Sequence, residues 1–319
     1  MNYNDDGYVT MLLTMALSPD KEEYARPYAT QEFHALEDAV HKSELRRMGR
    51  LLETDISGLM IYLNLSEEEG YRAFTLLHRS VQLSYALESF ERQGIHAVTC
   101  YDADYPARLK RKLGDAAPPF YYRCGSAELV SKPAVAIVGI QGVRTDEKVR
   151  EMLDRLVRGA VEAGYTVITG GELGVSRVAG LQAGQIGGSV LDVLGGGMAK
   201  HIHTDGVAEL IAMNCGAALS LVHPNAPFTV PHAIARNKVL FSLADAAFIF
   251  NTDGRRGETD ILQNRCCDWV YAWEGDPGSK ALISRGAIPM SSVRNTPFAD
   301  MSRHWSSSSS EQLNMFDLL

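Results

Sequence analysis

The stretch that most constrains the fold is a glycine-rich strand–turn–helix pattern in the middle of the chain. It begins with the apolar run 134–138, which ends at Gly139, and continues through an amphipathic segment over about 146–164. A second apolar run, 166–168, leads to Thr169 and the glycines after it. Two apolar β-branched runs joined by a helical segment are typical of a parallel sheet covered on both faces, and the missing Cβ of Gly139 favours a tight turn.

The alternation of strand and helix patterns continues toward the C-terminus. Further strands are expected at 189–194, 216–222, 246–251 and 268–273, with helices at about 174–183, 206–215, 231–243 and 258–267. Strands that alternate with helices predict an α/β fold, here a Rossmann-like, mostly parallel sheet covered by helices.

The chain before this pattern reads as helical, with apolar residues at helical spacing from about residue 8 to 94. We therefore predict a small all-helical domain over 1–95, a Rossmann-like domain over 96–290 and a flexible tail over 291–319. The tail contains the serine run 306–310, a composition typical of linkers.

The charge and hydropathy of the sequence indicate which classes of protein the chain can belong to. An apolar content of 45% and a charged content of 22% are ordinary for a globular protein. No apolar run is long enough to span a membrane, and the N-terminal residues 1–6 lack the basic flank of a signal peptide. We therefore expect a cytoplasmic protein without a membrane partner. Residues 1–100 hold 9 Lys and Arg against 16 Asp and Glu, so most of the net charge of −8 falls there. The remainder is near neutral and can carry a local basic groove.

Several chemistries find no support in the sequence. Five cysteines without a C-x-x-C pair argue against a disulfide framework and a structural zinc site. His201 and His203 have no partner cluster, so we expect no metal. Ser176 and Ser220 lack a G-x-S-x-G elbow, so we expect no catalytic residue of that kind and no cofactor.

Glycines follow three of the predicted strands. Because the carboxyl ends of parallel strands meet at one edge of a sheet, these loops predict a phosphate-binding crevice, although ordinary tight turns would leave the same pattern. The spacing is neither a dinucleotide fingerprint nor a P-loop. The candidate residues are Gly139, Gly170, Gly171, Gly174, Gly195 and Gly196.

Two basic segments are candidates for contact with phosphate. A guanidinium, an amide and an ammonium near one helix end suit phosphate and base recognition, with plain surface charge as the alternative. The residues are Arg236, Asn237 and Lys238, and, at a strand-to-helix turn, Arg255, Arg256, Gly257 and Thr259.

From about Phe90 to Ile288 the chain resembles the DprA/Smf DNA-processing family, part of the SLOG group of Rossmann-like folds. The blocks that carry the resemblance are Asp104-Tyr-Pro-Ala-Arg-Leu109, 132–139, 195–197, 235–238, 243–247 and 280–287. The N-terminal region is similar in placement to the sterile-alpha-motif-like domain of that family. The family's G-S-R is here Gly139-Ile-Gln, with Arg144 as the nearest substitute.

The resemblance implies a function in binding rather than catalysis. Proteins of that family bind single-stranded DNA at the pocket mouth, dimerise through the Rossmann-like domain, and load a RecA-type recombinase during natural transformation. We therefore expect a protein that protects single-stranded DNA or hands it to recombination proteins. Two alternatives within the SLOG group are an enzyme similar to the LOG phosphoribohydrolases and a nucleotide sensor in phage defence.

The end of the tail resembles the Q-L-x-L-F peptide that docks on the replication sliding clamp. Its residues are Gln312, Leu313, Met315 and Phe316. A rim glutamine with apolar anchors on a tether suits binding of a peptide in a groove, so the sliding clamp is a further expected partner.

Overall fold

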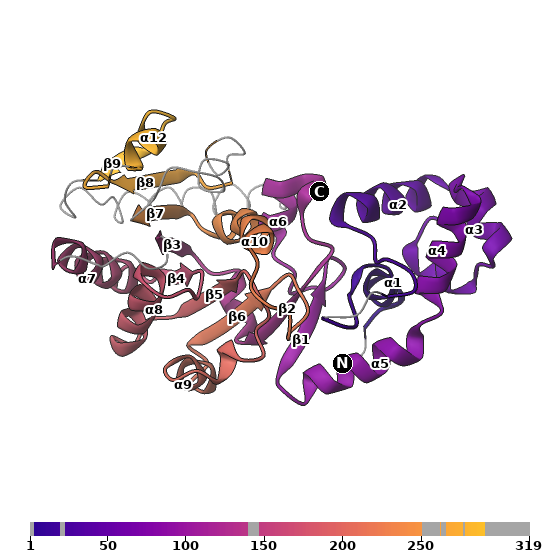
Figure 1. Cartoon of the computed structure of the whole chain (residues 1–319), viewed down its shortest axis with the longest axis horizontal. Helices are drawn as coiled ribbons and strands as arrows, with labels where there is room; N and C mark the ends of the chain where they lie inside the picture. The colour runs from indigo at the N-terminus through magenta and orange to yellow at the C-terminus, as the bar shows by residue number, and fades with distance from the viewer. Residues whose placement is uncertain are drawn as a thin grey trace, which may run out of the picture. The chain divides into compact units, whose positions relative to one another are not determined.

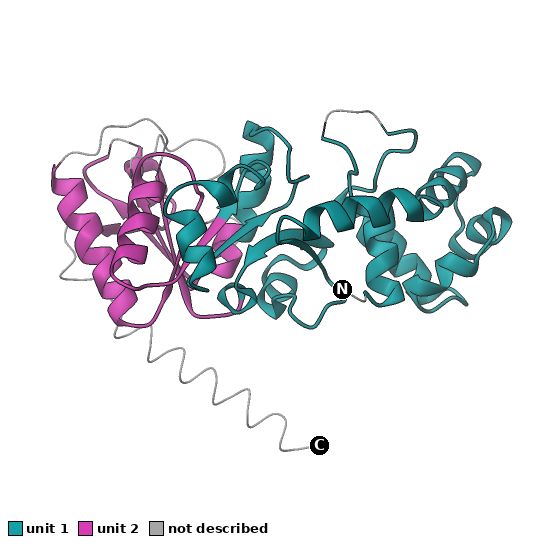
Figure 2. Ribbon diagram, turned by 90° about the horizontal axis from the view of Figure 1, so that it is seen from below, with its two compact units in different colours: residues 1–130, 193–239 teal, residues 131–192, 240–319 magenta. Residues whose placement is uncertain are grey.

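The chain divides into two compact units, shown in Figure 2. The computed structural model describes residues 3–19, 23–139, 147–250, 262, 266–276 and 278–290. Unit 1 contains residues 1–130 and 193–239, and unit 2 contains residues 131–192 and 240–319. The two units alternate along the chain. The domain boundaries predicted at 95/96 and 290/291 stay predictions.

The N-terminal part of unit 1 is helical, as predicted (Figure 1). Its elements are α1 (Asp5–Thr14), α2 (Thr30–Lys42), the 3-10 helix η1 (Met48–Glu53), α3 (Ile56–Leu63), α4 (Glu67–Leu77) and α5 (Ser80–Glu91). Helix α4 begins with a capping box, in which the Glu69 amide donates to the Ser66 hydroxyl and the Ser66 amide donates to the Glu69 carboxylate.

A buried arginine holds α1 against the start of α5. The guanidinium of Arg79 donates to the Leu12 carbonyl at 2.7 and 2.9 Å and to the Met15 carbonyl at 2.6 Å. It also forms an ion pair with Glu23. The last carbonyls of a helix have no partner inside the helix, so a guanidinium at this end both satisfies them and complements the helix dipole.

Two antiparallel strands follow in unit 1. Strand β1 (Ile95–Thr99) pairs with β2 (Phe120–Gly125), and helix α6 (Ala107–Leu113) lies between them in sequence. The carboxylate of Asp104 forms an ion pair with Arg123 of β2 at 2.6 Å, and the Tyr105 hydroxyl donates to the Pro118 carbonyl at 2.7 Å. The Asp104-Tyr-Pro block therefore fixes the connection between the two strands.

Apart from α12 and β9, the remaining strands and helices are close to the predicted ranges. They are β3 (Ala134–Gly139), α7 (Glu147–Glu162), β4 (Thr166–Thr169), α8 (Val175–Gln185), β5 (Val190–Leu194), α9 (Val207–Ala212), β6 (Gly216–Ser220), α10 (Val230–Leu243), β7 (Ala246–Phe250), β8 (Trp269–Trp273), α12 (Ser279–Ile283) and β9 (Ile288–Met290). The described strands follow the order β1-β2-β6-β5-β4-β3-β7-β8-β9. The predicted helix over 258–267 lies largely outside the described residues.

Most of this sheet is parallel. Strand β3 pairs in parallel with β4 and with β7, β4 pairs with β5, and β8 pairs with β7 and β9. The β1–β2 and β2–β6 pairs are antiparallel. Helices α7 and α8 pack against β4, and α8 also packs against β3. The prediction of a Rossmann-like, mostly parallel sheet after an N-terminal helical region is confirmed.

Three short elements were not predicted. Helix α6 and helix α12 are seven and five residues long, and β9 has only three residues. Segments of this length hold too few apolar positions for a periodic pattern, so the packing of the folded chain decides them. Among the described residues, no helix is both long enough and apolar enough to cross a membrane.

A half-buried hydrogen-bond chain links α2 to the β1–β2 connection in unit 1. The His34 ring lies 2.9 Å from the Glu37 carboxylate through Nδ1 and 2.8 Å from the Ala117 carbonyl through Nε2. The Tyr101 hydroxyl donates to Glu37. Both ring nitrogens of His34 face acceptors, so the doubly protonated ring fits best. The hydrogen bond to Glu37 raises the pKa of His34.

We predict that His34 makes the stability of the fold depend on pH. Because the pKa of His34 is raised in the folded chain, its contribution is complete below the unfolded value of about 6.5 and is lost as pH rises through the folded pKa. Urea denaturation between about pH 6 and about pH 8 measures this loss, of about 1 kcal/mol for a charged hydrogen bond in a half-buried site.

The variant His34→Gln is expected to remove this slope. The substitution His203→Gln, at an exposed histidine of the same unit, is the control and should keep the wild-type pH dependence. Parallel stability profiles for wild type and His34→Gln would contradict the assignment.

Candidate functional site

Gly139 ends strand β3 where another strand and a helix come close. A Cβ on Gly139 would lie 2.7 Å from the Phe250 carbonyl oxygen of β7 and 3.0 Å from the Val175 side chain at the start of α8. Contacts below 3.0 Å force a neighbour to move, and the backbone of β7 cannot move cheaply. The glycine is therefore required by close packing of β3, β7 and α8 within unit 2.

The loop after β4 is shaped by two glycines in the left-handed region. Gly171 has φ +71° and Gly174 has φ +99°, conformations that L side chains rarely adopt. Gly174 is the N-cap residue of α8. The first amides of α8 thus follow directly after this loop, and a helix N-terminus favours anions. The predicted glycines Gly139, Gly170, Gly171 and Gly174 all belong to unit 2.

A buried aspartate lies beside this loop. The Thr169 hydroxyl donates to the Asp192 carboxylate at 2.5 Å and accepts from the Gly171 amide at 2.9 Å. Asp192 is 6% exposed. Sequence reasoning missed this residue, although a single carboxylate inside the apolar strand 190–194 was the available signal. Its negative charge disfavours a phosphate close to Thr169.

The second group of predicted glycines packs under the segment 224–233 of unit 1. A Cβ on Gly195 would lie 2.9 Å from the Phe228 ring, and one on Gly197 would lie 2.2 Å from the Pro224 carbonyl oxygen. The Gly197 amide donates to the Ala226 carbonyl at 2.8 Å. Gly195 is buried and Gly196 is half-buried. These contacts give the glycines a packing role, and the phosphate contact predicted for Gly195 and Gly196 stays a prediction.

The three polar residues of α10 differ in their surroundings. Arg236 is 6% exposed, and its guanidinium donates to the Val193 carbonyl and to the Ala233 carbonyl, the latter at 3.4 Å. Burial lowers its pKa to about 10, so it stays charged at neutral pH. Asn237 is half-buried and Lys238 is exposed. Of these three, Lys238 has the side chain most accessible to a phosphate, whereas Arg236 links α10 to the end of β5.

An aromatic side chain beside the glycine turn was also missed. Phe228 is 54% exposed, although its backbone and ring approach Gly195 and Gly196. An exposed ring against a rigid backbone is suited to stacking with a base. The signal in the sequence was an aromatic residue between Pro227 and Thr229, where a loop is expected.

The other predicted residues fall outside the described part of the chain. They are Arg144, Arg255, Arg256, Gly257, Thr259, Gln312, Leu313, Met315 and Phe316. Among the described residues, no group of three or more His, Cys, Asp or Glu side chains is arranged to hold a metal ion. All five cysteines are free thiols.

We predict that Arg236 contributes to stability far more than its neighbour Lys238. The variant Arg236→Met leaves the Val193 carbonyl without its charged donor, which costs about 2–3 kcal/mol in the free energy of unfolding. Lys238→Met changes an exposed position and should stay within about 0.5 kcal/mol of wild type. Urea denaturation of both variants checks this, and equal losses would contradict the structural role of Arg236.

The sequence of the chain is similar to that of one known protein family. The model of a family described as DNA recombination-mediator protein A matches residues 96–290, more than half of the chain. A search of the curated proteins finds no match.

Two solved structures share the fold. The X-ray structure of DNA processing protein A from Streptococcus pneumoniae aligns with a TM-score of 0.59 and 20% identity, covering 84% of this chain and 96% of that one. DNA processing protein A from Helicobacter pylori, described with a unique single-stranded DNA binding mode, aligns with a TM-score of 0.53 and 17% identity, covering 67% of this chain and 98% of that one.

Proposed function

The chain belongs to the DNA recombination-mediator protein A family, and on that premise we propose that it binds single-stranded DNA and hands it to a recombinase. The observation that carries the proposal is the family match over 96–290. It is supported by the shared fold of the Helicobacter pylori protein, whose described property is single-stranded DNA binding. The proposed activity is binding and delivery, with no chemical step.

Phe228, which precedes α10, and Lys238, which lies in the middle of that helix rather than near its end as predicted, have the chemistry that this function requires. The exposed ammonium of Lys238 can pair with a phosphate, and the exposed ring of Phe228 can stack on a base. Binding of single strands commonly combines cations that follow the backbone with aromatic rings under the bases. A duplex hides the faces of its bases, so a stacking site of this kind favours single strands.

The charge distribution is compatible with this role. Almost all of the net negative charge lies in residues 1–95, before the segment that the family model matches, because 96–100 hold no Asp, Glu, Lys or Arg. The balance of the remaining chain is close to neutral, so a few exposed cations can produce a locally positive surface.

The proposed partners extend beyond DNA. A RecA-type recombinase would receive the strand, and two copies of the chain would associate through the Rossmann-like domain. Gln312, Leu313, Met315 and Phe316, which lie outside the described residues, would dock on the sliding clamp. The proposed place of action is the cytoplasm.

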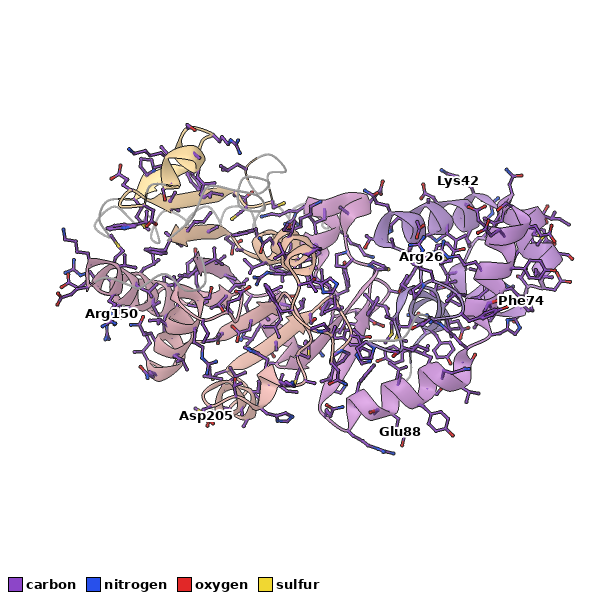
Figure 3. All side chains as sticks on the ribbon, viewed as in Figure 1. Arg26, Lys42, Phe74, Glu88, Arg150 and Asp205 are labelled. Atoms are coloured by element: carbon purple, nitrogen blue, oxygen red, sulfur yellow. The ribbon has the colours of Figure 1, made fainter. Side chains whose placement is uncertain are left out.

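We predict that labelled single-stranded DNA binds more tightly than a duplex of the same length, with strong dependence on salt. Fluorescence anisotropy between about 50 mM and about 200 mM salt measures both quantities. Lys238→Gln should reduce the slope of log K against log salt by about 0.7, the value for one lost contact with a single strand. The matched control is Lys42→Gln, an exposed lysine on α2 that pairs with Asp38 (Figure 3), and its slope should not change.

A preference for duplex DNA, or no binding to single strands at the lower salt concentration, would contradict the proposed function. Equal slopes for Lys238→Gln and wild type would instead show that Lys238 makes no contact with the DNA. That result would not contradict the proposed binding of single strands.

We predict that Phe228 supports binding through its ring. Phe228→Leu keeps an apolar side chain against Gly195 but loses base stacking, and the affinity for a single strand should fall about tenfold. The salt slope should stay as in wild type, because no charge changes. Tyr85→Leu, at an exposed aromatic ring on α5, is the matched control. An unchanged affinity for Phe228→Leu would exclude stacking at this position.

A further inference from the structure

Helix α6 of unit 1, labelled in Figure 1, carries a concentrated positive charge that the proposed DNA contacts do not use. Its seven residues contain four cations, Arg108, Lys110, Arg111 and Lys112, and no acidic residue. Lys110 and Arg111 are exposed. The helix therefore produces a local cationic surface on a chain whose net charge is negative.

Contacts on both sides of α6 in the chain hold this helix in place. Leu109 is 0% exposed and anchors the inner face of the helix. Before the helix, Asp104 forms an ion pair with Arg123 at 2.6 Å, and the Tyr105 hydroxyl donates to the Pro118 carbonyl, beyond the end of the helix, at 2.7 Å. Cations on an element that is already fixed lose little conformational freedom when they bind a ligand.

The charges of Lys110 and Arg111 are not paired within the described part of the chain. Neither side chain forms an ion pair with a described carboxylate. The Lys110 ammonium lies 5.7 Å from the centroid of the Tyr105 ring, a contact that leaves its charge intact. The nearby carboxylate of Asp102 accepts from the Thr99 amide at 2.6 Å and from the Thr99 hydroxyl at 2.9 Å. Both cations are therefore available to an anionic ligand.

The surface around α6 distinguishes between classes of anionic partner. Among the described residues, no large apolar side chain between 95 and 130 is exposed. A helix that lies on a membrane needs an exposed apolar face, and protein interfaces use aromatic and apolar side chains as anchors. A sugar-phosphate backbone is bound mainly through cations. A cationic surface without apolar anchors therefore favours the backbone of a nucleic acid.

The segment after α6 lies close to the proposed DNA contacts of unit 1. Pro118 lines a pocket of about 370 Å³ together with Ala226 and His232. Ala226 precedes Phe228 in the same loop, and His232 lies on α10, as Lys238 does. A strand held at Phe228 and Lys238 is thus bound near the connection that contains α6.

We propose that Lys110 and Arg111 each bind a phosphate of the single strand and form a second contact surface beside Phe228 and Lys238. This inference rests on the proposed function, because it assigns a further surface to the same ligand. Contacts with phosphate carry no information about the bases, so α6 holds strands of any sequence.

The salt dependence of binding tests the surface in the full-length protein. By fluorescence anisotropy, the double variant Lys110→Gln/Arg111→Gln should reduce the slope of log K against log salt by about 1.4, which is about 0.7 for each lost contact with a single strand. Both side chains are exposed, so circular dichroism and the melting temperature should stay near wild type. The charge-preserving variant Lys110→Arg/Arg111→Lys should keep the wild-type slope.

The matched control is Lys42→Gln/Arg50→Gln. It removes the same two charges from exposed positions of unit 1, and its slope should equal that of wild type. An equal loss of slope in this control overturns the proposal, since the effect would then come from the net charge. An unchanged slope for Lys110→Gln/Arg111→Gln also overturns it.

Labelled poly-glutamate with the same number of charges tests for an acidic protein as the partner. If Lys110→Gln/Arg111→Gln weakens the binding of poly-glutamate and leaves the DNA slope unchanged, the surface takes an acidic protein and the proposal is overturned. The two failures remain distinguishable. A wild type that binds no single strand at about 50 mM salt contradicts the proposed function itself. A wild type that binds single strands, with a slope that this double variant does not change, contradicts only the assignment of α6.

Discussion

The contact between the Arg236 guanidinium and the Val193 carbonyl is the interaction on which the candidate site depends. It joins the end of β5 to α10, two elements separated by about forty residues of chain. A buried guanidinium is stable only when its donors are satisfied, so the helix can occupy only a position that brings Arg236 to that carbonyl. The glycine turn at 195–197 is the counterpart of this contact, because any side chain there would push away Phe228 and Pro224.

The burial of Arg236 distinguishes a structural role from a binding role, although both predict the same kind of polar residue in a sequence. A motif of arginine, asparagine and lysine near a helix start suggests three ligands for phosphate, yet the helix turns the arginine inward and leaves the lysine outside. The glycines show the same separation. Gly171 and Gly174 are required by backbone conformation, whereas Gly139, Gly195 and Gly197 are required by the close approach of neighbouring backbone. The surface available for binding consists of the side chains that these contacts leave exposed, such as Lys238.

The N-terminal helical part packs with other elements of unit 1 and shares a pocket with them. Its residue Tyr28 lines a pocket of about 370 Å³ in unit 1, together with Tyr122 of β2 and His232 of α10. The ring of Tyr28 is in turn held by Arg72 of α4. Unit 1 is built from two stretches of chain, 1–130 and 193–239, and the family model over 96–290 does not include its N-terminal helices.

The sequence by itself determined the class of fold. Apolar β-branched runs that alternate with amphipathic segments leave a parallel, helix-covered sheet as the arrangement that buries them all, and β3 to β8 follow that pattern. Capping residues also act locally, so the start of α4 at Ser66 could be read directly.

Only the tertiary structure decided which of the candidate residues are accessible. The burial of Arg236 and the partner of Asp192 depend on elements that come together from distant parts of the chain. The same holds for Tyr28 and Tyr122, which are 94 positions apart and appear in the sequence as ordinary core aromatics. Periodicity reports the face on which a side chain lies, but hydrogen-bond partners across the fold are set by packing, which no local pattern contains.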